Sequence, residues 1–238
     1  GARPLNRYIQ DNIEDIIAMV SLYRPGPMEL IPSYIKRKHG QEKISYLHPK
    51  LEPILKNTYG IMIYQEQLMQ VARDVAGFTM SQADTLRKAV GKKIKKLMME
   101  QKEKFVKGVT TNTGSKYLGD ALWKLIEPFG SYGFNRSHAA AYASIAYQTA
   151  YLKTHYPLEF MTAAMAAEEK DVEKIALLVT ECERLGIKVL GPDINVSMQS
   201  FTPDPPFSIR FGLRAIKNVG HNIVEALVSE RDHGGSFR

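Results

Sequence analysis

Four polar residues stand directly before an alanine-rich run in the segment 132–153, YGFNRSHAAAYASIAYQTAYLK. Ser137 is a favourable N-cap residue, and the run behind it predicts a helix that continues to about Thr154. The start of a helix presents free backbone N–H groups and the positive end of the helix dipole, which together suit a phosphate. The segment therefore predicts either an anion site or a core helix with an ordinary cap. The candidate ligands are Asn135, Arg136, Ser137 and His138.

A second candidate anion site lies in TLRKAVGKK, residues 85–93. Arginine binds phosphate oxygens in a bidentate manner and lysine contributes a compact charge. Arg87 and Lys88, followed by Gly91, are therefore suited to a triphosphate. The segment lacks the pattern G-x-x-x-x-G-K-[ST], which excludes a P-loop.

The basic residues of the chain are concentrated in the same region. The segment 87–107 contains nine basic and two acidic residues, so its net charge equals the +7 of the whole chain. Such a segment favours a polyanionic partner, with nucleic acid first and an anionic membrane surface second. The alternative is a solvated, lysine-rich helix face that binds no partner. The candidate DNA ligands are Lys92, Lys93, Lys95, Lys96, Lys102 and Lys107.

Periodicity and capping residues predict that the chain is mainly α-helical. Trp123, the only tryptophan, is predicted to lie in the core. Strand signals are confined to IKVL (187–190) and FSIRFGL (207–213), on either side of a proline-rich connection, TPDPPF. Asn12 is predicted to cap a helix that continues to Tyr23. Further helices are predicted over 28–39, 115–127 and 137–154, within 64–77, from Ser81 onward and across 94–105.

Near the C-terminus, AIKNVGHNIVEALVSE has the pattern of a helix–hairpin–helix, with Val219 and Gly220 at the turn. Such a turn directs backbone amides at a DNA phosphate without reading bases. A glycine-containing turn between two helices is also common in α-helical proteins that bind no DNA. The residues predicted to face inward from the second helix are Ile223, Ala226 and Leu227.

Residues for catalysis or metal binding do not stand together in the sequence. The aspartates are scattered and form no Asp-x-Asp pair, and the histidines lack metal-ligand spacing. A Gly-x-Ser-x-Gly elbow is absent. The single cysteine, Cys182, has the spacing of an apolar residue in a helix seam. We therefore expect no catalytic residue, no metal ligand and no bound cofactor in this chain.

The composition is that of a globular protein, since 44% of the 238 residues are hydrophobic and 24% are charged. One cysteine provides no disulfide framework. No apolar stretch reaches the roughly 18 residues typical of a membrane span, and the first residues lack the pattern of a secretory signal. These features predict a cytoplasmic protein without a membrane partner.

Several segments together resemble a known family. SLYRPGPMELIPSYIKRKHG (21–40), YGIMIYQEQLMQVARDVAGFTMSQADTLRKAVGKK (59–93) and FGSYGFNRSHAAAYASIAYQTAYLKTHYPLEFMTAAM (129–165) resemble the fingers region of the bacterial DNA polymerase III alpha subunits, the C-family replicative polymerases. GPDIN (191–195) and FGLRAIKNVG (211–220) resemble the passage from those fingers into a helix–hairpin–helix. The resemblance covers residues 12–238 in the family's order.

The resemblance implies a multi-helix polymerase fingers domain, followed by a small α+β segment that contains the helix–hairpin–helix. Arg87 and Lys88 fall where the family has a basic pair facing the phosphates of the nucleotide. Residues 135–138 fall on the family's GFN[KR]SH segment, which lines the same pocket. The implied ligands are a deoxynucleoside triphosphate (dNTP) and template-primer DNA, and the implied activity is nucleotidyl transfer in DNA replication.

The resemblance also implies that this chain is a fragment, inactive by itself. In the family a palm domain with catalytic aspartates and Mg²⁺ precedes this segment, and segments that follow it reach the sliding clamp. The palm and the remaining domains of the same polymerase are therefore expected partners. Asn218 stands where the first hairpin glycine is usual, which weakens the expectation of close phosphate approach there.

The expected division of the chain follows the same resemblance. Residues 1–11 match poorly and are expected to be an artificial end or a junction. The other parts are a fingers core (12–168), a helical extension with short strands and a proline-rich linker (169–212), and a truncated helix–hairpin–helix (213–238).

Two alternatives of other classes remain open from the residues alone. One is a stand-alone DNA-binding structural protein that uses the basic helix and the hairpin. The other is a peripheral membrane protein that docks through residues 92–107. Preference for anionic vesicles over duplex DNA would favour the second of these.

Overall fold

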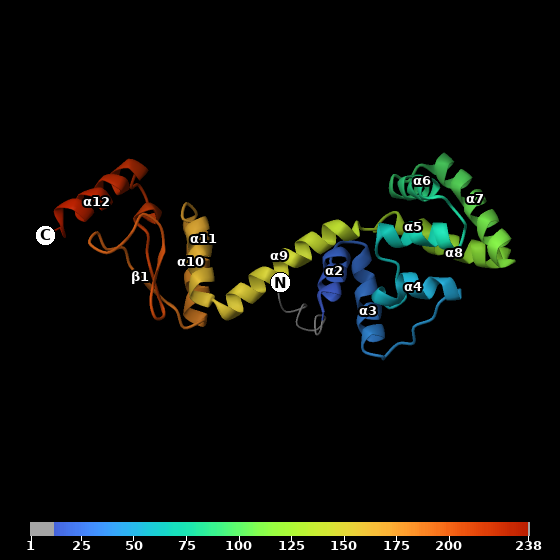
Figure 1. The fold of residues 1–238 in the computed structure, drawn as a ribbon, viewed down its shortest axis with the longest axis horizontal. Coiled ribbons are helices and arrows are strands. Elements are labelled where there is room, and N and C mark those ends of the chain that lie inside the picture. Colours follow the sequence, from blue (N-terminus) through green and yellow to red (C-terminus); the bar gives the residue numbers. More distant parts are fainter. Residues whose placement is uncertain (1–11, 238) are drawn as a thin grey trace. The chain divides into compact units, whose positions relative to one another are not determined.

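The computed structural model describes residues 12–237, so the predicted end piece 1–11 lies outside the described residues. The fold is mainly α-helical with a small three-stranded sheet near the C-terminus, which confirms the predicted fold class (Figure 1). The chain divides into two compact units, Gly1–Ala146 and Tyr147–Arg238. This division falls inside the helix α9 (Arg136–His155), whereas the sequence-based boundary stands at residue 168.

The first helices of the first unit pack on the beginning of α9. Asn12 caps the first of them as predicted, because its side chain accepts hydrogen bonds from the amides of Glu14 and Asp15 at 2.6 and 3.3 Å. Ala139 and Ala143 of α9 are buried in the same apolar cluster, and their small side chains permit close approach. The elements are α2 (Ile13–Leu22), the 3₁₀ helix η1 (Pro27–Leu30) and α3 (Ile31–Lys38).

The larger core of the first unit is formed by α5, α6, α7 and α8, which lie together in Figure 1. Trp123 is buried there beside Phe105, as predicted. Only glycine fits at position 130, because an added Cβ would lie 2.2 Å from the Val90 carbonyl oxygen. The elements are η2 (Pro49–Leu51), α4 (Glu52–Leu55), η3 (Lys56–Thr58), α5 (Gln65–Asp74), α6 (Met80–Gly91), α7 (Lys95–Thr113) and α8 (Lys116–Phe129).

Two helix starts differ from the prediction because a neighbouring residue supplies the cap. α6 begins at Met80, one residue before the predicted Ser81, since the Thr79 hydroxyl accepts from the Gln82 amide at 3.2 Å. The predicted Ser137 cap of α9 is wrong. Asn135 caps this helix, because its side-chain oxygen accepts from the His138 amide at 2.8 Å.

The second unit packs two helices against a sheet whose strand order is β1-β3-β2. β1 runs parallel to β3 and β2 runs antiparallel to it. The strand β2 was not predicted: it lies in the proline-rich connection, where Pro203 sits opposite Ile209. A proline is tolerated there because β2 is an edge strand. The elements are α10 (Pro157–Ala167), α11 (Val172–Arg184), β1 (Lys188–Leu190), β2 (Thr202–Asp204), β3 (Ser208–Arg210), η4 (Leu213–Ala215) and α12 (His221–Gly234).

Cys182 of α11 is fully buried among apolar side chains of the second unit, as predicted. Burial raises the pKa of its thiol to about 11, so the group stays protonated near neutral pH. None of the helices in the described part of the chain combines the length and the apolar character needed to cross a membrane.

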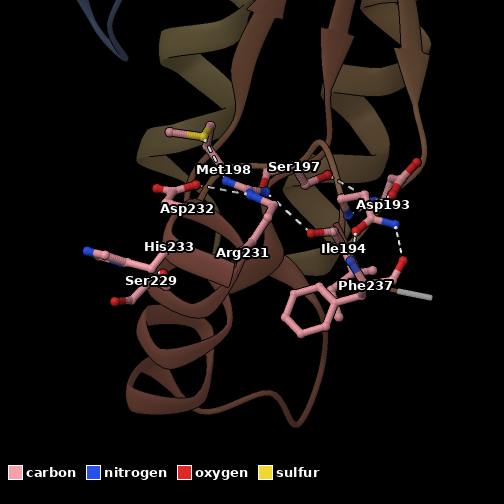
Figure 2. A network of polar contacts seen from close by, with 10 residues as sticks. Asp193, Ile194, Ser197, Met198, Ser229, Arg231, Asp232, His233 and Phe237 are labelled. Carbon is pink, nitrogen blue, oxygen red and sulfur yellow. Dashed lines mark hydrogen bonds and ion pairs between the residues drawn. The ribbon is translucent and has the colours of Figure 1, made fainter. Parts of the chain in front are cut away.

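The last helix is fixed to the loop that carries the GPDIN motif (Figure 2). The Arg231 guanidinium donates to the carbonyl oxygens of Ile194 and Ser197 at 3.3 and 2.7 Å. Asn195 exchanges two hydrogen bonds with the backbone of Phe237, at 2.7 and 3.1 Å. These contacts hold the C-terminal end of α12 in place.

The predicted inward face of α12 is wrong. Val224 and Val228 are its buried residues and pack on Leu213, whereas Ile223 is 57% exposed and Ala226 is also exposed. Valines one turn apart give the same helical spacing as the predicted set, so periodicity alone did not select the face.

Candidate nucleotide and DNA interface

The start of α5 connects the two candidate anion-binding segments. The Gln65 amide donates to the Phe134 carbonyl oxygen at 2.8 Å, and its side-chain nitrogen donates to the Gly133 carbonyl oxygen at 3.3 Å. The side-chain oxygen of Gln65 accepts from Arg87 Nη1 at 3.3 Å. Arg87 and residues 133–134, which are remote in sequence, therefore meet at Gln65.

A buried glutamine fixes the chain that leads into α5. The Gln67 side-chain oxygen accepts from the amides of Ile63 and Tyr64 at 2.8 and 2.9 Å, and its nitrogen donates to the Thr58 hydroxyl at 2.8 Å. The Ile63 carbonyl in turn accepts from the Phe134 amide at 3.1 Å. The side-chain oxygen and nitrogen of the buried Gln67 thus both have hydrogen-bond partners. This arrangement fixes the position of Gln65 against the 133–136 segment.

Arg87 and Lys88 of α6 share one carboxylate. Arg87 Nε and Nη2 donate to Asp84 Oδ1 at 2.9 and 2.8 Å, and Lys88 Nζ lies 2.7 Å from Asp84 Oδ2. The hydrogen bonds from Lys88 and Arg87 lower the pKa of Asp84, so this carboxylate is ionised at neutral pH. The positive charges of Arg87 and Lys88 are therefore partly neutralised by Asp84.

The start of α9 is also held by acidic side chains. The Glu66 carboxylate accepts from the Arg136 amide at 3.1 and 3.0 Å and from Asn135 Nδ2 at 2.9 Å. The Arg136 guanidinium lies 2.6 Å from Glu14, and this hydrogen bond raises the pKa of Arg136. The start of α9 thus binds an anionic group of the chain itself.

The other two residues of the predicted quartet lie on the exposed side of the first turn of α9. Ser137 and His138 are both exposed. The His138 ring lies between aromatic neighbours, with centroid distances of 5.6 Å to Phe134 and 4.7 Å to Tyr142. The imidazole is therefore supported by packing and accessible to a ligand.

Sequence reasoning missed Arg24, Gln65 and Glu66. Arg24 Nη2 donates to the Tyr132 carbonyl oxygen at 2.8 Å, and its guanidinium lies 4.3 Å from the centre of the Phe134 ring. Burial lowers the pKa of Arg24. These three side chains meet the 132–136 segment only after folding, so no local pattern could identify them.

The predicted DNA-binding lysines form an exposed row along α7 and the turn before it. Each of them is exposed, and no ion pair within residues 12–237 neutralises any of them. The row contrasts with the basic pair on α6, whose charges are paired. The residues are Lys92, Lys93, Lys95, Lys96, Lys102 and Lys107.

The predicted hairpin turn lies between a short 3₁₀ helix, η4, and α12. Asn218 adopts a left-handed conformation with φ of 68°, as a residue at a glycine position must. Val219 and Gly220 follow, and Gly220 immediately precedes α12. A cavity beside the turn is lined by Lys170, Arg214 and Lys217, together with Glu169 and several apolar side chains.

Metal binding is not indicated within residues 12–237, where no group of three histidine, cysteine, aspartate or glutamate side chains is placed to hold an ion.

Comparison with known proteins identifies two family matches. Residues 3–113 match the family described as the bacterial DNA polymerase III alpha subunit finger domain, and residues 186–238 match a helix-hairpin-helix motif. Residues 3–113 belong to this finger-domain family. The family match includes α5, α6 and α7, which carry Gln65, the basic pair and most of the lysine row.

Relatives named DNA polymerase III subunit alpha align with nearly the whole chain. The protein from Thermus aquaticus is 49% identical over 95% of this chain, and that from Chlamydia pneumoniae is 48% identical over 95%. The protein from Escherichia coli K12 is 45% identical over 100%. The chain spans only 18 to 21% of the length of these relatives.

Proposed function

We propose that this finger domain binds the triphosphate of an incoming dNTP for a DNA-directed DNA polymerase of the replicative type. The observation that carries the proposal is the contact of Arg87 with Gln65, which also binds the carbonyl of Gly133. It brings the α6 cations and the first turn of α9 to one place. Fixed cations and donors stabilise the charge that develops as pyrophosphate leaves.

Each element has a defined part in this proposal. Arg87 and Lys88 supply charge from α6, whereas Asn135, Arg136, Ser137 and His138 supply donors from α9. The chemical step belongs to a palm domain with Mg²⁺, which stabilises the attacking and leaving oxygens. The remaining polymerase domains and a sliding clamp are further proposed partners.

The proposal is tested by hydrogen exchange on this chain with and without a dNTP. Bound triphosphate should slow exchange of the amides in residues 132–138 and leave those of the α11 helix unchanged, because only the former lie at the site. A stand-alone DNA-binding protein would show no such protection by nucleotide.

Template-primer DNA is the second proposed ligand, bound without sequence preference by the α7 lysines and by the turn at Val219 and Gly220. If about four lysines meet phosphates, log K should fall against log salt with a slope of roughly −3 to −4. Fluorescence anisotropy with labelled duplexes at several salt concentrations measures this slope. A slope near zero, or preference for one sequence, would contradict the assignment.

A further inference from the structure

Three carboxylates of the chain bind the donor groups that the proposed function assigns to the triphosphate. Asp84 binds Arg87 and Lys88, and Glu14 binds the Arg136 guanidinium. Glu66 is different, because it binds the backbone amide of Arg136 and the Asn135 side chain. Its two oxygens thus contact a helix start in the manner of a phosphate.

The buried hydroxyl of Tyr64, two residues before Glu66 in the sequence, has no hydrogen-bond partner within residues 12–237. Tyr64 is only 2% exposed, and its hydroxyl oxygen is unpaired. The Arg136 guanidinium lies 5.8 Å from the centre of the Tyr64 ring. Burial, followed by the charge of Glu14, raises the pKa of this hydroxyl, so it remains a donor. A buried polar group without a partner is costly, so this one marks a place where an acceptor is missing.

We propose, on the basis of the proposed function, that Glu66 is an exchangeable occupant of the phosphate site at the start of α9. Its carboxylate binds the Arg136 amide and Asn135 in the nucleotide-free chain. A phosphate group of the dNTP replaces it at these donors, with the Tyr64 hydroxyl available as a further donor.

The position of Glu66 favours exchange with a phosphate over a purely structural role. It stands in the first turn of α5, where the helix dipole stabilises an acidic side chain even after the contact with α9 is lost. The side chain is also partly exposed, so it can move into solvent. When no nucleotide is bound, an anionic occupant also keeps the Arg136 amide and the Asn135 side chain hydrogen-bonded.

The exchange is tested by Glu66→Gln in this chain, with inorganic tripolyphosphate in Mg²⁺-free buffer as the probe. Glutamine preserves the volume and one acceptor oxygen but removes the competing charge. We expect calorimetry to show tripolyphosphate binding about five-fold more tightly, which corresponds to about 1 kcal/mol. The control Glu103→Gln makes the same charge change on an exposed residue of α7 and should alter Kd less than about two-fold.

A second readout locates the effect. The NMR signal of the Arg136 amide should shift during the titration of the wild-type chain and at lower probe concentration in Glu66→Gln. Unchanged affinity in Glu66→Gln, or an equal gain in Glu103→Gln, would overturn the inference. Weaker binding would make Glu66 a positioning residue and overturn it as well.

The proposed function fails separately from this inference. If dNTP protects residues 132–138 but Glu66→Gln leaves tripolyphosphate affinity unchanged, only the exchange is wrong. If neither dNTP nor tripolyphosphate perturbs these residues in either chain, the proposed site and the exchange are both wrong.

Discussion

Arg87→Ala, introduced into a polymerase that carries this finger domain, should raise the apparent KM for dNTP and lower kcat together. The guanidinium is held by Asp84 and Gln65 beside the 133–136 segment, so it can meet the triphosphate in both the ground state and the transition state. Loss of one charge-assisted contact costs about 1.5–3 kcal/mol, or roughly ten- to over a hundred-fold in kcat/KM. Steady-state incorporation of a single nucleotide measures both constants.

Two further variants separate the nucleotide site from the DNA surface. His138→Ala should change kcat/KM in the same direction but less strongly, because a neutral imidazole donates one hydrogen bond and no charge.

Lys107→Ala removes an exposed cation of α7 and should weaken DNA binding while nucleotide kinetics stay nearly intact. If Arg87→Ala behaved like Lys107→Ala, the assignment of Arg87 to the triphosphate would be wrong.

The sequence was sufficient where a property depends on neighbouring residues. The Asn12 cap and the burial of Trp123 both follow from local preferences, and the structure confirms them. The basic pair and the start of α9 could likewise be selected by residue type. Their proximity followed only from the family resemblance and not from residue type, because in the structure it depends on Gln65, a residue with no signal of its own.

Local preference failed where two residues compete for one role. Asn135 and Ser137 are both good caps, and only the fold shows that the Asn135 side chain reaches the His138 amide. Pro203 is unfavourable in a strand, yet it pairs opposite Ile209 because β2 lies at the sheet edge. Edge position is a tertiary property, so the sequence alone favoured a loop.

Lys38→Met should strongly destabilise the first unit. Lys38 Nζ forms an ion pair with Asp15, whose side chain is 1% exposed, and the Tyr34 hydroxyl donates to the same carboxylate at 3.0 Å. Burial, and then the charge of Asp15, raise the pKa of Tyr34, so this hydroxyl remains a donor. Removal of the lysine leaves a carboxylate in an apolar cluster with too little compensation. We expect the free energy of unfolding to fall by about 3–5 kcal/mol.

Urea unfolding of the first unit, followed by Trp123 fluorescence, measures this loss, and Lys36→Met is its matched control. Lys36 lies on the same helix but is exposed, so its replacement should change the free energy by less than about 0.5 kcal/mol. Combining Lys38→Met with Asp15→Asn should recover part of the stability, because the asparagine oxygen still accepts from Tyr34 and no charge remains buried. Equal effects of Lys38→Met and Lys36→Met would show that this buried pair does not stabilise the surface on which α9 packs.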